Sequence, residues 1–208
     1  MQIIAVQNRD TCANTAALIA DMHRLRCKIF RGRLGWDVSV RDGQEADQYD
    51  KLGPTYILAV LNERQVVGCA RLLPADGPTM LRDTFPQLLG EGGLRSHAAM
   101  VESSRFCVDT LELGGGRSQV HQATLAMFAG ILEWSCLKGY TEIATVTDVR
   151  FERILRRAGW PMRRLGPPRQ IDETLSVAGI LAADRESFDR LRPTIYSSHF
   201  DRCAHLAA

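Results

Sequence analysis

Three carboxylates stand close together in the segment EADQYD, where Glu45, Asp47 and Asp50 end a long polar stretch. Carboxylates at this spacing repel one another unless cations lie nearby. Arg26 and Arg71 are the candidate partners, because an arginine–carboxylate pair with two hydrogen bonds fixes its own geometry. The alternative interpretation is an acidic loop that faces water, since short runs of charge are usually solvated.

A second pair of charges lies in the segment MVESSRFCVD, whose other residues are typical of a buried strand. Glu102 and Arg105 are an odd number of positions apart, so they would face opposite sides of an ideal strand unless a bulge intervenes. A buried glutamate needs either a partner or a raised pKa, and a raised pKa suits a general base. Glu102 is therefore the candidate base, and a structural ion pair is the alternative.

Arginines dominate the segment between residues 150 and 169, where Glu152 is the one acid. They are Arg150, Arg153, Arg156, Arg157, Arg163, Arg164 and Arg169. In a helix over residues 151–158 the apolar side chains share one face, so the arginines beside them must mostly project outward. A basic face suits the steering of an acidic protein. Nucleic acid is the other partner considered, but no aromatic platform or recognised motif accompanies the arginines.

The hydrophobic pattern predicts alternating strands and helices as the scaffold for these side chains. Strands are expected over residues 1–6, 56–61, 66–73, 101–108, 143–147 and 176–182. Helices are expected over residues 13–30, 81–89, 119–138, 151–158 and 184–191. The polar segment 31–54 is long for a loop inside a compact domain, so it is either functional or disordered. This order of elements predicts an α/β (α+β) fold with a mixed sheet flanked by helices.

The composition is that of an ordinary globular protein: 208 residues, of which 45% are hydrophobic and 24% charged, with a formal net charge of +2. We expect one domain over residues 1–192 and a loosely held C-terminal tail over residues 193–208. No apolar run approaches a membrane span, and the first residues do not resemble a signal peptide. The six cysteines form no CxxC pair and no zinc-ligand pattern. Reduced thiols, no metal and a cytoplasmic location follow as expectations.

Nine polar and aromatic positions together resemble the LuxI-type acyl-homoserine-lactone synthases. They are Arg26, Phe30, Trp36, Asp47, Asp50, Arg71, Phe85, Glu102 and Arg105. The segments MHRLRCKIF, GRLGWDVSV, EADQYD, GCARLLP, PTMLRDTFPQLL and VESSRF carry the match between residues 1 and 190. MVESSRFCVDT and GYTEIATVTDVRFERILRRAGWP are most similar to the TraI branch, which is linked to plasmid conjugation in rhizobia-like bacteria. The resemblance implies a GNAT-like acyltransferase fold with a V-shaped mixed β-sheet and helices on both sides.

The resemblance also implies a reaction without a cofactor. The α-amine of S-adenosylmethionine attacks an acyl thioester on acyl carrier protein, and the carboxylate of S-adenosylmethionine then closes the lactone and expels methylthioadenosine. Glu102 would take a proton from the amine, and Arg105 would meet the substrate carboxylate or brace Glu102. Because acyl carrier proteins are acidic, the family's donor fits the basic segment. The docking residues expected there are Arg150, Arg153, Arg156 and Arg157.

Substrate-binding roles follow from the same resemblance. Phe30 and Trp36 would stack on the adenine or face the sulfonium of S-adenosylmethionine. Asp47 and Asp50 would hold its ammonium or, for at least one of them, tie the loop to the arginines. Core packing remains an alternative for Trp36.

An apolar tunnel is expected for the acyl chain. Thr145 and Thr147 share one face of the expected strand with Ile143. The other candidate lining residues are Phe85, Leu125, Met127 and Phe128. In family members that make 3-oxo signals, a threonine stands at the position matching Thr147. The TraI branch implies a 3-oxo chain of about octanoyl length, and a purely structural threonine is the alternative.

Two other functions remain open from the sequence. A GNAT-type N-acetyltransferase would share the fold without needing Trp36 and the EADQYD segment together. A catalytically silent protein that binds S-adenosylmethionine or nucleic acid would not need Glu102. The segment Gly114–Arg117 before a helix is a weak phosphate-binding pattern, and a flexible hairpin is the preferred interpretation there.

Overall fold

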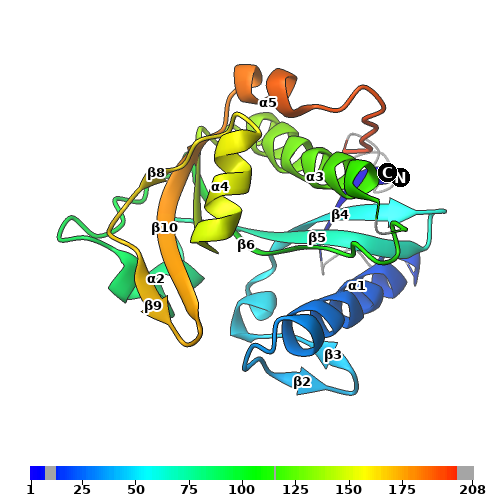
Figure 1. Cartoon of the computed structure of the whole chain (residues 1–208), viewed down its shortest axis with the longest axis horizontal. Helices are drawn as coiled ribbons and strands as arrows, with labels where there is room; N and C mark the ends of the chain where they lie inside the picture. The colour runs from blue at the N-terminus through cyan, green and yellow to red at the C-terminus, as the bar shows by residue number, and fades with distance from the viewer. Residues whose placement is uncertain (8–12, 115, 201–208) are drawn as a thin grey trace. The chain divides into compact units, whose positions relative to one another are not determined.

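The structure, a computed structural model, describes residues 1–7, 13–114 and 116–200 (Figure 1). The helices are α1 (Ala13–Arg26), which a π-helix (Cys27–Arg33) continues, α2 (Met80–Asp83), α3 (Arg117–Leu137), α4 (Val149–Arg157) and α5 (Arg185–Leu191), with 3-10 helices at Gln48–Leu52 and Pro86–Leu88. The strands are β1 (Gln2–Gln7), β2 (Val40–Arg41), β3 (Gln44–Glu45), β4 (Thr55–Leu61), β5 (Gln65–Pro74), β6 (Met100–Val108), β7 (Glu142–Asp148), β8 (Arg163–Arg164), β9 (Arg169–Ile171) and β10 (Thr174–Ala182).

In the described part of the chain, eight strands form one sheet in the order β1-β4-β5-β6-β7-β10-β8, with β9 paired to β10. Strand β1 is antiparallel to β4, and β10 is antiparallel to β7, with Val177 opposite Thr147. Strand β6 is parallel to β7, with Glu102 level with Ala144. A mixed sheet flanked by helices confirms the predicted fold class.

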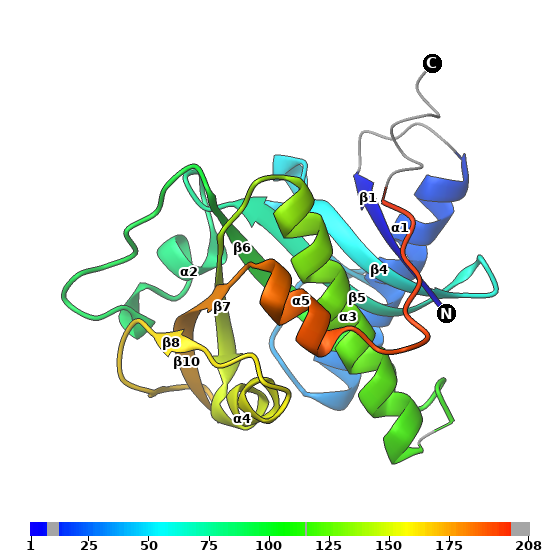
Figure 2. The same cartoon turned by 90° about the horizontal axis from the view of Figure 1, so that it is seen from above.

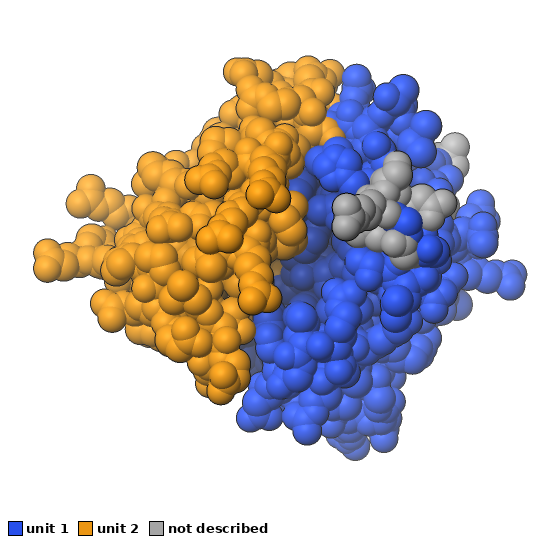
Figure 3. All heavy atoms as spheres, in the orientation of Figure 1, with its two compact units in different colours: residues 1–71, 105–131, 192–208 blue, residues 72–104, 132–191 orange. Residues whose placement is uncertain are grey.

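Contacts divide the chain into two compact units (Figure 3). Unit 1 comprises residues 1–71, 105–131 and 192–208, and unit 2 comprises residues 72–104 and 132–191. Strands β5 and β6 and helix α3 contribute residues to both units. The predicted single domain over residues 1–192 stays a prediction.

Strand β4 is buried on both faces in unit 1, which explains its unbroken apolar run. On one face Tyr56 packs in a cluster with Met22 of α1. On the other face Gly130 of α3 lies so close to the sheet that a Cβ there would stand 2.5 Å from Ile3 and 3.2 Å from Ile57. Helices α1 and α3 therefore cover opposite faces of these strands, as Figures 1 and 2 show.

One face of the sheet in unit 2 packs against the segment that follows β5. Leu81, Leu88 and Ala144 belong to its hydrophobic cluster, and Phe85 packs against that cluster. Because side chains alternate along a strand, Thr145 and its neighbours at odd positions of β7 point to the opposite face.

Several predicted elements end or continue differently in the structure. The helix expected over residues 13–30 is α-helical only to Arg26, because the backbone then widens into the π-helix. The helix expected over 81–89 is interrupted after Asp83, since Phe85 has non-helical backbone angles and Pro86 begins a new 3-10 turn. The short strands β2, β3, β8 and β9 were not predicted.

The C-terminal tail is held differently from the expectation. The backbone N–H of Ile3 donates to the carbonyl of Ser197, and the N–H of His199 donates to the carbonyl of Ile3. The expectation of a loosely held tail is therefore wrong for residues 197–199, because their backbone pairs with β1. Cys12 and Cys203 lie outside the described residues, and the other four cysteines are free thiols, as predicted. No helix in the described ranges is long and apolar enough to cross a membrane.

Candidate active site

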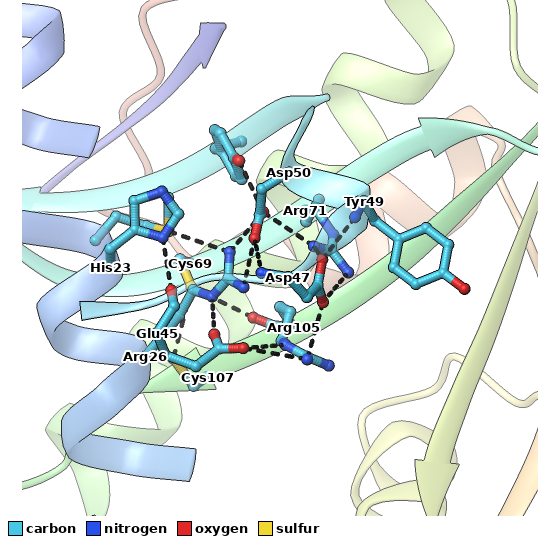
Figure 4. A network of polar contacts seen from close by, with 12 residues as sticks. His23, Arg26, Glu45, Asp47, Tyr49, Asp50, Cys69, Arg71, Arg105 and Cys107 are labelled. Carbon is cyan, nitrogen blue, oxygen red and sulfur yellow. Dashed lines mark hydrogen bonds and ion pairs between the residues drawn. The ribbon is translucent and has the colours of Figure 1, made fainter. Parts of the chain in front are cut away.

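Three arginines and three carboxylates of unit 1 form a closed cycle in which every carboxylate bridges two arginines (Figure 4). Opposite charges therefore alternate around the cycle, and the formal charges cancel. We call this cycle the charge ring; in order, its members are Arg26, Glu45, Arg105, Asp47, Arg71 and Asp50.

Glu45 closes the ring from strand β3. Its Oε2 accepts from Nε of Arg26 at 2.5 Å. Its Oε1 accepts from Nε and Nη2 of Arg105, at 3.2 and 3.1 Å. Glu45 is 0% exposed, and the buried His23 holds its backbone carbonyl through Nδ1 at 2.7 Å.

Asp47 and Asp50 bind the arginines from the 3-10 helix at Gln48–Leu52. Arg71 donates to Asp47 at 2.5 and 3.1 Å and to Asp50 at 2.9 Å. Arg26 donates to both oxygens of Asp50, at 2.8 and 3.0 Å, and Arg105 lies 2.9 Å from Asp47. The side chain of Asp47 caps the helix, and its N–H donates to Asp50 at 2.8 Å. The predicted tie between these acids and Arg26 and Arg71 is therefore present for both.

Burial and pairing set the charge states around the ring. Burial opposes the ionisation of Asp50, but the hydrogen bonds and charge of Arg26 outweigh it and hold the pKa of Asp50 well below its usual range. Burial and then the neighbouring Asp50 carboxylate raise the pKa of Tyr56, whose hydroxyl donates to Asp50. Burial and then the charge of Arg26 lower the pKa of His23. Neutral His23 thus donates its Nδ1–H to the carbonyl of Glu45.

Only one edge of the ring retains appreciable exposure. The side chains of Arg26 and Arg71 are 0% exposed and that of Asp50 is 6% exposed, whereas Asp47 is 17% and Arg105 11% exposed. Asp47 and Arg105 are neighbours in the ring, so the edge presents one carboxylate beside one guanidinium. A zwitterionic amino acid carries the complementary pair of charges.

An aromatic stack adjoins this edge. The guanidinium of Arg105 lies over the ring of Phe30, with 5.6 Å from Cζ to the centroid. Phe30 also stacks on Trp36, with the ring centroids 5.0 Å apart and the planes at 4°. Phe30 is buried, whereas Trp36 is 38% exposed. Of the two residues expected to stack on a substrate, Trp36 is the one that keeps exposed surface.

Glu102 is fixed by backbone hydrogen bonds in unit 2. Its two oxygens accept from the N–H groups of Met80 and Leu81, at 3.0 and 2.6 Å. Glu102 is 2% exposed. The sequence required either a partner or a raised pKa for this buried glutamate, and the structure supplies partners. Arg105, on the same strand, has a φ of +52°, which breaks the regular alternation of side chains as a bulge would.

The arginines of α4 form a surface of a different kind. Arg150, Arg153, Arg156 and Arg157 are exposed, as predicted, and none of them forms a salt bridge within the described residues. Glu152 instead pairs with Arg164, through two contacts of 2.6 Å. Beside the helix lies a cavity of about 410 Å³. Its lining is Val149, Glu152, Arg153, Arg156, Pro161, Met162, Arg164, Pro168 and Leu175.

The expected lining residues of the acyl tunnel fall in both units. Met127 is buried in unit 1 and approaches Gly68 of β5, and Leu125 is half-buried in the same unit. In unit 2, Phe85 packs on the face of the sheet that bears Ala144, opposite the face of Thr147. The tunnel as a whole stays a prediction.

The sequence profile described as autoinducer synthase matches residues 10–191. An acyl-homoserine-lactone synthase of Rhizobium radiobacter is 56% identical over 197 residues, which are 94% of this chain and 93% of the relative. One of Agrobacterium fabrum is 56% identical over 199 residues, which are 95% and 94% of the two chains.

This chain belongs to the autoinducer synthase family. The relatives are acyl-homoserine-lactone synthases, so the predicted family, its rhizobial branch and the assignment as an acyltransferase are confirmed.

Solved structures agree with this family. The crystal structure of the AHL synthase LasI matches with a TM-score of 0.79 and 31% identity, over 91% of this chain and 93% of LasI. The CoA-dependent acyl-homoserine lactone synthase BjaI, with SAM and isopentyl-CoA, matches with a TM-score of 0.83 and 26% identity, over 99% and 96% of the two chains. A putative N-acetyltransferase from Lactobacillus plantarum, at 15% identity and a TM-score of 0.58 over 88% of this chain and 100% of its own, shares the fold alone.

For this autoinducer synthase, the residue missed as a site residue is Glu45. The sequence placed it in the acidic cluster, with Arg26 and Arg71 as candidate partners, but gave it no role in the site. Its position two residues before Asp47 in EADQYD was the available signal, and a cluster of three acids requires about as many cations. Arg105 was expected near the substrate or Glu102, and its described partners in unit 1 are Glu45 and Asp47.

Proposed function

We propose that this autoinducer synthase joins an acyl group to the amine of S-adenosylmethionine and then closes the homoserine lactone. The observation that carries the proposal is the exposed edge of the charge ring, where Asp47 and Arg105 lie 2.9 Å apart. The amino-acid part of S-adenosylmethionine has an ammonium and a carboxylate on one carbon, which complement these two side chains. That BjaI was solved with SAM supports this choice of substrate.

Trp36 extends the proposed substrate site beyond the amino-acid group. One face of its ring is covered by Phe30, and the residue as a whole is 38% exposed. An aromatic face that is supported from behind can stack on adenine or contact a sulfonium, worth about 0.5–2 kcal/mol for the cation–π contact. We assign adenine or sulfonium contact to Trp36 and the support of Trp36 to Phe30.

Glu102 is the proposed general base. The ammonium of S-adenosylmethionine must lose a proton before its nitrogen can attack, and Glu102, directly or through one water, accepts that proton. The nitrogen then bonds to the thioester carbonyl carbon, and the C–S bond breaks to release the thiol of the donor. In the second step a carboxylate oxygen bonds to the γ-carbon, the bond to the sulfonium sulfur breaks, and methylthioadenosine leaves.

The fixed position of Glu102 suits this role. Two backbone N–H groups hold its carboxylate in one orientation. A base whose geometry is fixed before the substrate arrives needs no reorganisation during the reaction.

Acyl carrier protein is the proposed donor, with α4 as its docking surface. Four exposed arginines on this helix, with no salt bridge in the described part of the chain, favour an acidic partner. Ile154 and Leu175 are each 44% exposed on this part of unit 2, so apolar contacts can accompany the charged ones. BjaI is CoA-dependent, which makes acyl-CoA the competing donor.

A 3-oxo acyl chain of about octanoyl length is the proposed cargo. The hydroxyl of Thr145 donates to the carbonyl of Ser103 at 2.9 Å, whereas no hydrogen bond of the Thr147 hydroxyl is found among the described residues. Thr147 is half-buried, and the 3-oxo oxygen would accept a hydrogen bond from its hydroxyl. Of the two threonines, Thr147 is therefore the proposed reader of this group.

One experiment tests the whole assignment. The purified protein is incubated with S-adenosylmethionine and each of four donors, the octanoyl and 3-oxooctanoyl thioesters of acyl carrier protein and of CoA, and the products are weighed by mass spectrometry. Acyl-homoserine lactone and methylthioadenosine in equal amounts, fastest with 3-oxooctanoyl carrier protein, are expected. Faster turnover with the CoA thioesters overturns the donor, and acylation of the amine without methylthioadenosine overturns the lactone-forming step.

A further inference from the structure

Glu45 occupies a different place in the charge ring from the other two carboxylates. The ion pairs that the described residues give Asp50 are with the two fully buried arginines, and Asp47 reaches the exposed edge itself. Glu45 is fully buried and yet bonds Arg105, the one arginine of the ring with exposed surface. It therefore connects the interior of unit 1 to the exposed edge.

Arg105 needs outside support to keep its orientation. Its φ of +52° lies in the left-handed region, which costs a residue with a side chain about 1–2 kcal/mol. Its Nε and Nη2 both donate to Oε1 of Glu45. Two bonds from one side of a planar guanidinium to one oxygen limit its rotation, and Phe30 covers one of its faces.

We infer that Glu45 is a positioning residue, which orients Arg105 so that its guanidinium meets the carboxylate of the amino-acid substrate. The inference rests on the proposed function, because it takes S-adenosylmethionine as the ligand of the Asp47–Arg105 edge. Glu45 has no exposed surface and acts on the substrate only through Arg105. Arg26 and His23 in turn hold Glu45 by its other carboxylate oxygen and by its backbone carbonyl.

The test compares two ligands that differ only in the carboxylate. Dissociation constants for S-adenosylmethionine and for decarboxylated S-adenosylmethionine are measured by calorimetry on the wild-type protein and on Glu45→Gln. Loss of the oriented, charge-assisted contact is expected to weaken S-adenosylmethionine binding about tenfold. Binding of the decarboxylated ligand should change by less than about twofold, since it lacks the group that Arg105 meets.

Asp50→Asn is the matched control. It also removes one buried carboxylate from the ring, but that carboxylate pairs with Arg26 and Arg71 at the buried side of the ring. Both variants are expected to lose stability, and the ratio of the two dissociation constants within one variant is independent of the folded fraction. The ratio should shift in Glu45→Gln and stay at the wild-type value in Asp50→Asn. If Glu45→Gln does not fold, Glu45→Asp, which keeps the charge but shortens the reach, should shift the ratio in the same direction.

Three results would overturn the inference. Equal weakening of both ligands by Glu45→Gln means that Glu45 is merely structural. An equal shift of the ratio of dissociation constants in Glu45→Gln and Asp50→Asn means that the loss of any buried carboxylate of the ring has the same effect. In the double variant Glu45→Gln with Arg105→Gln, a loss beyond that of Arg105→Gln alone means that Glu45 does not act through Arg105. If the wild-type protein binds neither ligand, the proposed substrate is refuted. That outcome is distinct from the three results above, in which the wild-type protein binds S-adenosylmethionine.

Discussion

The charge ring of unit 1 and the α4 surface of unit 2 both depend on arginine, but they differ in burial and in pairing. Arg26 and Arg71 are fully buried, and each contacts two carboxylates. Arg153 and Arg156 are exposed and form no salt bridge within the described ranges. Removing one partner from a buried pair leaves an uncompensated charge, whereas an exposed charge is solvated and can meet another molecule. Burial therefore separates arginines that build the site from arginines that can recruit a partner.

Glu102 is a buried carboxylate outside the ring, and its substitution is expected to have the largest effect on activity. Glu102→Gln should lower kcat about 10²–10⁴-fold, because the amide cannot take the proton of the ammonium. The measurement is kcat at saturating substrates, with circular dichroism to verify the fold. Near-normal turnover in a folded variant would reduce Glu102 to a structural role.

Breaking the ring should affect stability most. Asp50→Asn leaves Arg26 and Arg71 without the carboxylate that bridges them, and should lower the free energy of unfolding by about 3–5 kcal/mol. Urea denaturation followed by circular dichroism measures this. Arg153→Gln on the exposed surface is the counterpart, with a change within about 0.5 kcal/mol. Similar losses in the two variants would refute the distinction between the two groups of arginines.

Reversing the charge of arginines on α4 should weaken the binding of the acyl donor and leave the binding of S-adenosylmethionine unchanged. Arg153→Glu with Arg157→Glu should raise the KM for acyl carrier protein about tenfold, weaken its salt dependence and leave the KM for S-adenosylmethionine unchanged. Arg41→Glu with Arg64→Glu is the control, since both residues are exposed in unit 1 and the charge change is the same. An unchanged KM for carrier protein in the α4 variant would mean that docking occurs elsewhere.

The ring should also respond to pH through His23. Burial and the charge of Arg26 lower the pKa of His23 in the folded protein, so the unfolded chain binds a proton at a higher pH than the folded one. Stability should then fall as pH drops below about 6.5, by up to about 1.4 kcal/mol per pH unit from this group. His23→Asn can keep a donor to Glu45, and it should flatten the fall between pH 7 and 5 in urea denaturation. Parallel pH profiles for the two proteins would exclude His23 as the source.

The smallest effect is expected at Thr147. Thr147→Val keeps the shape and removes the hydroxyl, so it should erase a preference for 3-oxo over unsubstituted donors that is a few-fold to about tenfold. Competition between the two carrier-protein thioesters measures the preference directly. Equal losses with both donors would show that Thr147 supports the pocket without contacting the 3-oxo group.

The fold was predictable where periodicity was strong. Strands β4 and β5 and helices α3 and α5 were predicted within a few residues, because apolar runs and stop signals such as Gly139 mark them. The π-helix was not predicted, since a change from i→i+4 to i→i+5 backbone hydrogen bonds over a few residues leaves no clear pattern in the side chains. Strands β8 and β9 are too short and too basic to carry a period-two signal.

The sequence predicted which residues belong to the site, but it did not predict all of the ion pairs that connect them. The acids and arginines were identified from residue type and from the resemblance, and the partners of Asp50 were anticipated. That Glu45 completes the ring depends on β3 pairing with β2 and on the backbone of Arg105 turning to a positive φ. Such long-range geometry arises only when distant segments meet, so no local pattern contains it.

The pairing of residues 197–199 with β1 has a consequence for handling the protein. β1 is an outer strand of the sheet, and the tail satisfies backbone groups of Ile3 that would otherwise face solvent. An unpaired strand edge is a template for association with other chains. Shortening the chain at residue 192 should therefore promote aggregation before it affects catalysis, and an affinity tag at the N-terminus lies next to the same edge.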